Sequence, residues 1–154
     1  MDYFQGTVEN YLRADRKLFL NSEYLLQLDP DKNLPLKDRH WYVDVLAIDF
    51  RDEKIWLCEI TYSKTLSALL KRLRAWQENW DELKYALQRD TLHPEGFTAQ
   101  PWIFVPTEMR ERFIEKFVPS NSAKGMPNPR ITNLDRVLPW NYKTWNRPGY
   151  VDEA

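Results

Sequence analysis

The stretch WYVDVLAIDF at residues 41–50, followed after RDEK by IWLCEITY at 55–62, predicts two neighbouring β-strands. Both runs are rich in β-branched and aromatic residues, and the short charged segment between them is typical of a hairpin connection. Each strand has an acidic residue in the middle of a mostly apolar run, Asp44 in the first and Glu59 in the second. Because a buried charge is costly without a partner, these two residues are the first candidates for a functional site.

Two hairpin registers bring Asp44 and Glu59 to the same face of the sheet. A turn centred on the Asp52–Glu53 peptide places Thr61 opposite Asp44 and makes Glu59 its diagonal neighbour, whereas a turn centred on Arg51–Asp52 places the two acids directly opposite each other. Cross-strand Cβ distances of about 4.5–5.5 Å for direct neighbours, and under about 7–8 Å on the diagonal, allow both carboxylates to reach one metal ion. A register shifted by one residue would separate them onto opposite faces.

Two carboxylates at this distance repel each other, and a divalent cation with oxygen ligands, Mg²⁺ or Mn²⁺, removes that repulsion. A structural zinc site is not expected, because Cys58 is the single cysteine and the two histidines lie far apart in sequence. Two other interpretations of Asp44 and Glu59 stay open. The acids could lie at water-exposed strand ends, or they could pair with arginines in structural ion pairs.

The residues around the hairpin predict further helices and strands in an order typical of an α/β protein, with helices on both sides of a mixed sheet. Leucines and tryptophans spaced by threes and fours predict one helix between Lys64 and Arg89, with Ser63 as its N-cap. Residues 24–28 could extend the first helix or form a strand. The other expected elements are a helix within 2–19, a strand at 100–106, a helix at 107–118 and a short strand within 130–138.

At these residues the chain resembles the PD-(D/E)xK nuclease superfamily, over roughly residues 3–106. The resemblance rests on Asp44 in YVDVLAI, fourteen intervening residues, and Glu59 in LCEITYSK. It implies a restriction-endonuclease-like αβββαβ core in which Asp44, Glu59 and the main-chain carbonyl of Ile60 hold Mg²⁺ or Mn²⁺ for attack of water on a DNA phosphodiester. It also implies an accessory acid at Glu9 on the first helix, a position that without the resemblance would be a solvated helix residue.

The sequence departs from the family pattern at Thr61, which stands where the motif lysine is expected. A hydroxyl cannot stabilise developing negative charge as an ammonium does. Some members supply the lysine from the following helix, and here Lys64 and Lys71 are candidates, on one stripe with Ser67 and Arg74. That stripe could equally be an ordinary exposed helix face.

Composition limits the remaining possibilities. The chain has 154 residues, a formal charge of −1 and only four glycines, so we expect one domain over 1–154, a less regular extension at 119–154, and no glycine-rich phosphate loop. The single cysteine and the lack of a signal-like N-terminus favour a cytoplasmic protein. No apolar run approaches the about 18 residues of a membrane span.

Two functions follow from the sequence. The first is a metal-dependent deoxyribonuclease in which Asp44 and Glu59 are ligands, Glu9 is an accessory acid, and Lys64 or Lys71 stabilises the transition state. The second is a nuclease-fold module that lost catalysis with the motif lysine and binds a protein partner, a second copy of itself as a homodimer, or nucleic acid.

Overall fold

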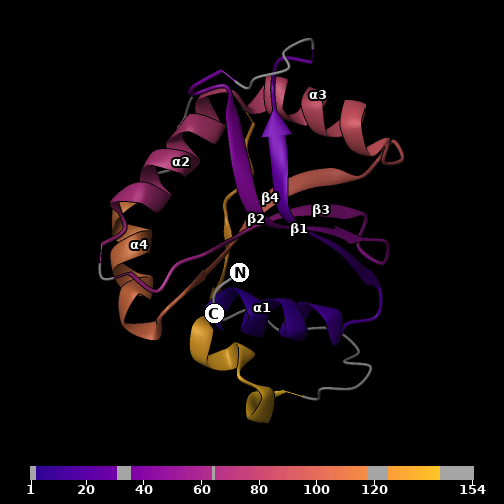
Figure 1. Ribbon diagram of the computed structural model, residues 1–154. Coiled ribbons are helices and arrows are strands. Elements are labelled where there is room, and N and C mark those ends of the chain that lie inside the picture. Colours follow the sequence, from indigo (N-terminus) through magenta and orange to yellow (C-terminus); the bar gives the residue numbers. More distant parts are fainter. Residues whose placement is uncertain (1–2, 31–35, 64, 118–124, 143–154) are drawn as a thin grey trace.

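The computed structural model describes residues 3–30, 36–63, 65–117 and 125–142, and it shows an α/β fold in which helices flank a five-stranded sheet (Figure 1). This arrangement confirms the expected α/β class. The elements in chain order are α1 (Tyr3–Arg13), β1 (Leu18–Gln27), β2 (His40–Asp49), β3 (Lys54–Ile60), α2 (Ser67–Glu78), α3 (Trp80–Thr91), β4 (Thr98–Val105), the 3-10 turn η1 (Thr107–Met109), α4 (Arg110–Lys116), β5 (Arg130–Asn133), η2 (Leu134–Val137) and η3 (Pro139–Asn141).

The sheet has the strand order β1-β2-β3-β4-β5 and is mixed. The first three strands pair antiparallel as a meander, whereas β4 pairs parallel to β3, and β5 parallel to β4. A parallel pair needs a crossover connection, and α2 with α3 provides it between β3 and β4.

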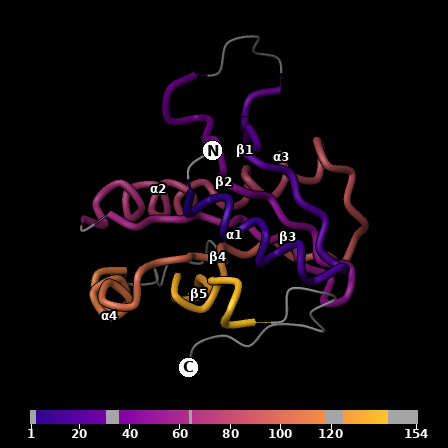
Figure 2. The backbone as a smooth tube through the Cα atoms, turned by 60° about the horizontal axis from the view of Figure 1, so that its bottom comes forward, coloured from indigo at the N-terminus to yellow at the C-terminus, as the bar shows by residue number. Residues whose placement is uncertain are grey.

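Each face of the sheet carries its own hydrophobic core. On one face α1 and η2 pack against side chains such as Val45, Cys58 and Trp102. On the other face α2, α3 and α4 pack against side chains such as Leu57 and Ile103. Figure 1 and Figure 2 show α1 beside the C-terminal segment and away from α2 and α3. Alternate strand residues therefore supply opposite cores, which explains the nearly continuous apolar runs of β2 and β3.

The first helix is shorter than the periodicity predicts. It ends at Arg13, and residues 18–27 form β1, which resolves the ambiguity at 24–28 in favour of a strand. Asp15, only 1% exposed, turns the chain by accepting a hydrogen bond from the Lys17 N–H at 3.2 Å and by pairing with Arg51 at 2.7 Å. Leu18 matches helical spacing because it enters the same core as Leu12, although it does so from a strand.

The expected single helix of residues 64–89 is wrong, because it breaks at Asn79 into α2 and α3. The Asn79 side chain donates to the carbonyl of Ala75 at 2.9 Å, and such side-chain bonds to the backbone compete with helix continuation. Ser63 is also not the N-cap: Leu66 holds that position, and the Ser63 hydroxyl accepts a hydrogen bond from the Thr65 N–H at 3.2 Å.

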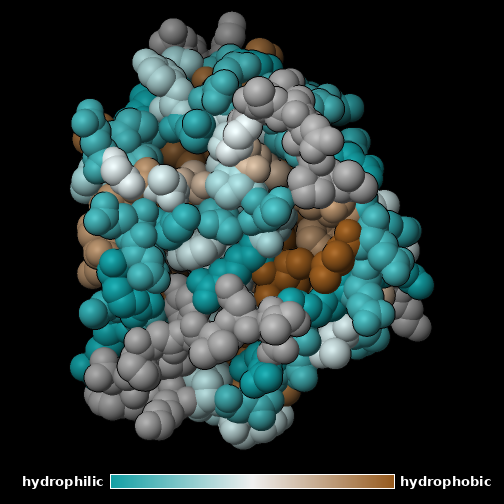
Figure 3. Space-filling model, turned by 180° about the vertical axis from the view of Figure 1, so that it is seen from behind, coloured by the Kyte–Doolittle hydropathy of each residue, from teal (hydrophilic) through white to brown (hydrophobic). Residues whose placement is uncertain are grey.

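The remaining expectations hold with shifted bounds. The strand expected at 100–106 is β4, the helix at 107–118 is η1 followed by α4, and the short strand within 130–138 is β5. Of the extension at 119–154, the structure describes residues 125–142. No helix among the described residues has the length and apolarity to cross a membrane. Seen from behind, the surface is mostly hydrophilic, with a hydrophobic area right of the centre and smaller hydrophobic areas elsewhere (Figure 3).

Candidate functional site

Asp44 and Glu59 meet where the ladder between β2 and β3 ends. The paired residues run from Asp49↔Lys54 to Val45↔Cys58, so the next position along the ladder sets Asp44 directly opposite Glu59. This register corresponds to the turn centred on Arg51–Asp52, and it rules out the diagonal alternative. The sequence therefore predicted the pairing of the two acids correctly.

The carboxylates take the place of main-chain partners at this point. Glu59 Oε2 accepts a hydrogen bond from the Asp44 N–H at 2.9 Å, and Asp44 Oδ2 accepts one from the Ile60 N–H at 2.9 Å. Each acid is thus bound to the backbone of the opposite strand. These reciprocal bonds fix both carboxylates at the end of the ladder without a residue from outside the hairpin.

The two faces of the β1–β2 ribbon are exchanged at Asp44, and this exchange brings the Asp44 side chain to Glu59. Regular pairing holds at Ser22↔Val45 and at Tyr24↔Val43, but between these pairs Glu23 has a positive φ of 53°. Val45 belongs to the core under α1, whereas Val43 belongs to the core under α2 and α3. The strand therefore exchanges its faces at Asp44. Figure 1 shows the same bend, as β1 and β2 turn towards α3.

Arg72 on α2 supplies the cation next to Glu59. Its Nη1 forms an ion pair with Glu59 Oε1 and also lies 3.4 Å from the carbonyl oxygen of Tyr42. The Glu59 side chain is 3% exposed and that of Arg72 is 36% exposed. Glu59 is therefore buried in the protein, whereas its cationic partner reaches it from the surface.

The charge of Glu59 is only partly compensated. Burial, and then the neighbouring Asp44, raise the pKa of Glu59 to about 7 from its usual 4.5, although Arg72 and the Asp44 N–H act in the opposite direction. A carboxyl group with this pKa gives up its proton near neutral pH. A further cation at this place would hold it ionised.

A cavity of about 200 Å³ opens beside the two acids, large enough for an ion with some of its water. Its lining residues are Asp44, Glu59, Ile60, Thr61, Ala68, Leu69 and Arg72. A second cavity, of about 310 Å³, adjoins the first through Ala68 and Arg72, and Lys37, His40, Trp41 and Lys71 contribute to its wall.

The structure places only one of the two lysines predicted from the sequence, and it is not beside the acids. Lys64 is outside the described residues. Lys71 borders the second cavity and not the one beside the acids. The prediction from the sequence missed Arg72, although a signal was present. Ala68, Arg72 and Ala75 follow the spacing i, i+4, i+7 on one side of α2. Two small residues on either side of a long one leave room for the long side chain to lie along the helix.

Glu9 is fully buried, which corrects the interpretation as a solvated helix residue. Its carboxylate accepts hydrogen bonds from Arg13 at 3.1 Å, from Gln5 at 3.4 Å and from the Ser22 hydroxyl. Gln5 also donates to the main-chain carbonyl of Asp44 at 3.3 Å. Glu9 thus connects to Asp44 through Gln5, from the sheet face that α1 covers.

The donors beside this cavity suit a hard divalent cation: two carboxylates and the carbonyl of Ile60 are all oxygen ligands. Within the part of the chain that the structure describes, no group of three or more His, Cys, Asp and Glu side chains comes close enough to hold a metal. The site therefore offers two carboxylates and no third acidic or imidazole ligand. An ion there would keep several waters, as Mg²⁺ usually does.

Comparison of the chain with protein-family models, curated proteins and solved structures gives no match.

Proposed function

We propose that this chain is a divalent-cation-dependent nuclease, similar to the PD-(D/E)xK enzymes, that hydrolyses DNA phosphodiester bonds. The order α1, β1, β2, β3, helix, β4 supports this proposal, because it is the order of a restriction-endonuclease-like core. The observation that carries it is the direct opposition of Asp44 and Glu59, two carboxylates held side by side with incomplete charge compensation.

In this proposal Asp44, Glu59 and the main-chain carbonyl of Ile60 hold Mg²⁺ or Mn²⁺. The bound ion would polarise the phosphate and lower the pKa of an attacking water. The protein orients the ligands through the hydrogen bonds of each carboxylate to the opposite strand. Glu9 acts indirectly, as a positioning residue that holds Gln5 against the backbone of Asp44.

Arg72 takes the role that the motif lysine would have. Its guanidinium lines the cavity with the two acids, while Thr61 at the motif position uses its hydroxyl to accept a hydrogen bond from the Ser63 N–H at 3.3 Å. A guanidinium presents a planar pair of donors to phosphate oxygens and stays charged at every working pH. Arg72 would thus release Glu59 to the metal and stabilise the charge that develops on the phosphate.

A second candidate is a non-catalytic module of the same fold, which binds a protein partner, a second copy or nucleic acid. The ion pair between Arg72 and Glu59 favours this alternative, because it shows a side chain already occupying the position of a cation. The absence of a lysine at Thr61 points the same way. The two candidates differ in one respect that can be measured: whether Asp44 is required for cleavage.

The test is nicking of supercoiled plasmid DNA with Mn²⁺ or Mg²⁺. Asp44→Asn is expected to lower the rate about 100-fold or more, because it removes a ligand charge at the reacting centre. Asp81→Asn, at a side chain 84% exposed on α3, is the matched control and should leave the rate unchanged. Equal rates for wild type and Asp44→Asn would refute the nuclease and favour the module.

A further inference from the structure

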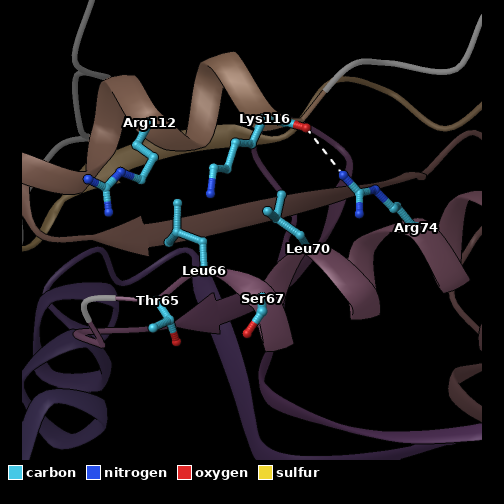
Figure 4. A pocket seen from close by; sticks show the side chains of 7 residues that line it. All are labelled: Thr65, Leu66, Ser67, Leu70, Arg74, Arg112 and Lys116. Carbon is cyan, nitrogen blue, oxygen red and sulfur yellow. Dashed lines mark hydrogen bonds between the residues drawn. The ribbon is translucent and has the colours of Figure 1, made fainter.

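A cavity on the α2 side has three cations in its lining. It measures about 430 Å³ and lies between α2 and α4. The residues that line it are Thr65, Leu66, Ser67, Leu70, Arg74, Arg112 and Lys116 (Figure 4). Three of these carry positive charge, and no acidic residue belongs to the described lining.

The three cations come from two elements and face the same space. Arg112 and Lys116 are four residues apart on α4, so they share one face of that helix, and Figure 4 shows the Lys116 side chain extending towards Leu66 and Leu70, with Arg112 beside it. Arg74 reaches the same place from α2, where its Nη2 lies 3.4 Å from the carbonyl oxygen of Lys116. Positive charges that line one cavity repel each other, so an anion bound between these three side chains would be stabilised.

Within the described part of the chain, two of these cations have no partner of their own. Neither the guanidinium of Arg112 nor the ammonium of Lys116 makes a hydrogen bond or an ion pair there. Leu66 and Leu70, 3% and 5% exposed, form the apolar part of the lining. Guanidinium and ammonium groups that face a cavity suit a phosphate group, because charge-assisted hydrogen bonds to phosphate are strong.

The cavity lies across α2 from the acids. Ala68 and Arg72 border the cavity of Asp44 and Glu59, whereas Ser67 and Arg74 border this one. Residues one and two positions apart on a helix point in different directions, so the two cavities flank α2. They are separated by about one helix diameter, 10–12 Å, so phosphates of one DNA strand at the two places would be a few nucleotides apart.

We propose that Arg74, Arg112 and Lys116 form a binding site for a backbone phosphate of DNA, a few nucleotides from the phosphate at Asp44 and Glu59. This inference rests on the proposed function, which identifies DNA as the source of the phosphate. It also explains how a chain of net charge −1 holds a polyanion: the positive field is local to α2 and α4.

The experiment measures binding of a fluorescent DNA duplex by anisotropy in EDTA, over a series of salt concentrations. The variant R112Q/K116Q should bind at least about tenfold more weakly at low salt, and the slope of log K against log salt should become about 0.9 less steep, as expected when the protein neutralises one phosphate fewer. The control K17Q/K84Q removes the same charge at exposed residues away from the cavity, and it should retain the wild-type slope.

Two outcomes would overturn a site for a DNA phosphate: equal weakening by both double variants, or no duplex binding by the wild type, the latter with or without NMR shifts from inorganic phosphate at Arg112 and Lys116. Such shifts without duplex binding would identify free phosphate as the ligand. Binding in EDTA is independent of cleavage, so the two proposals can fail separately. Duplex binding that needs Arg112 and Lys116, without any plasmid nicking, would leave this site intact and refute the nuclease.

Discussion

The carboxylate of Glu59 lies between two neighbours of opposite charge, Asp44 on β2 and Arg72 on α2. Asp44 and burial favour the protonated form of Glu59, whereas Arg72 favours the ionised form. A divalent cation would act in the same direction as Arg72 and more strongly, because it carries twice the charge. The chemistry of the site thus depends on which cation balances Glu59.

Arg72→Gln separates the two roles of Arg72. The substitution removes the cation that competes for Glu59 Oε1, so Mn²⁺ should bind at least as tightly as in wild type. Cleavage should nevertheless fall about 10²–10³-fold, because a donor to the phosphate is removed. Calorimetry and plasmid nicking measure the two effects independently.

Lys71→Gln is the comparison that decides which cation stabilises the phosphate: Lys71, the candidate from the sequence, or Arg72, the candidate from the structure. Lys71 lies on the same helix but borders the neighbouring cavity. A larger loss of cleavage in Arg72→Gln supports the role of Arg72. A larger loss in Lys71→Gln would return that role to the lysine stripe.

The pH dependence of stability provides a prediction about Glu59 without metal. Its pKa in the folded protein, about 7, lies above 4.5, so the folded state holds the proton more tightly than the unfolded state. The resulting stability is fully present below pH 4.5 and is lost as the pH rises through 7. Glu59→Gln cannot ionise, so it should gain on the order of 2–3 kcal/mol relative to wild type between pH 5 and pH 8. Urea unfolding in EDTA measures this change, and a difference independent of pH would contradict it.

At the scale of elements, the bend of the β1–β2 ribbon delivers Asp44 to the site. Glu23 adopts the left-handed conformation at the point where both strands exchange faces. That conformation costs a residue with a Cβ about 1–2 kcal/mol, and a β-branched residue more. The strand thus accepts local strain in order to turn Asp44 towards Glu59.

Substitutions at Glu23 test this account of the bend. Glu23→Gly relieves the strain but adds freedom to the unfolded chain, so its free energy of unfolding should stay within about 1 kcal/mol of wild type. Glu23→Val should lower the free energy of unfolding by more than about 1 kcal/mol and should also weaken Mn²⁺ binding, because Asp44 shifts. Equal stability of the two variants would show that Glu23 does not set the bend.

The helices α2 and α3 show that apolar periodicity in the sequence does not reveal where a helix breaks. The apolar spacing of residues 66–87 continues across the break at Asn79, because Trp76 and Trp80 are still four residues apart. Each tryptophan is buried in the same core, 0% and 1% exposed, so a bent pair of helices satisfies the same pattern as a straight helix. Periodicity therefore predicts which residues are buried better than it predicts where a helix ends.

At the scale of the whole molecule, the sheet separates two cores and brings one end of the β2–β3 hairpin next to α2. The hairpin follows from local sequence, and both registers that the sequence left open bring Asp44 and Glu59 to one face; the structure selects the direct pairing. The face of α2 that meets them depends on how the crossover packs on the sheet, and this is a long-range property. For that reason the sequence could not distinguish Arg72 from Lys71, and it could not reveal that Ser22 and Arg13 bury Glu9.

The central claim is that Asp44 and Glu59 bind a divalent cation, and titration of the metal-free protein with Mn²⁺ in a calorimeter tests it most directly. One equivalent of Mn²⁺ should bind to wild type and to the control Asp81→Asn, and binding should be lost in both Asp44→Asn and Glu59→Gln. Circular dichroism of the four proteins verifies that they are folded. Absence of Mn²⁺ binding to folded wild type, or undiminished binding by Asp44→Asn, would contradict the metal site and leave Arg72 as the permanent partner of Glu59.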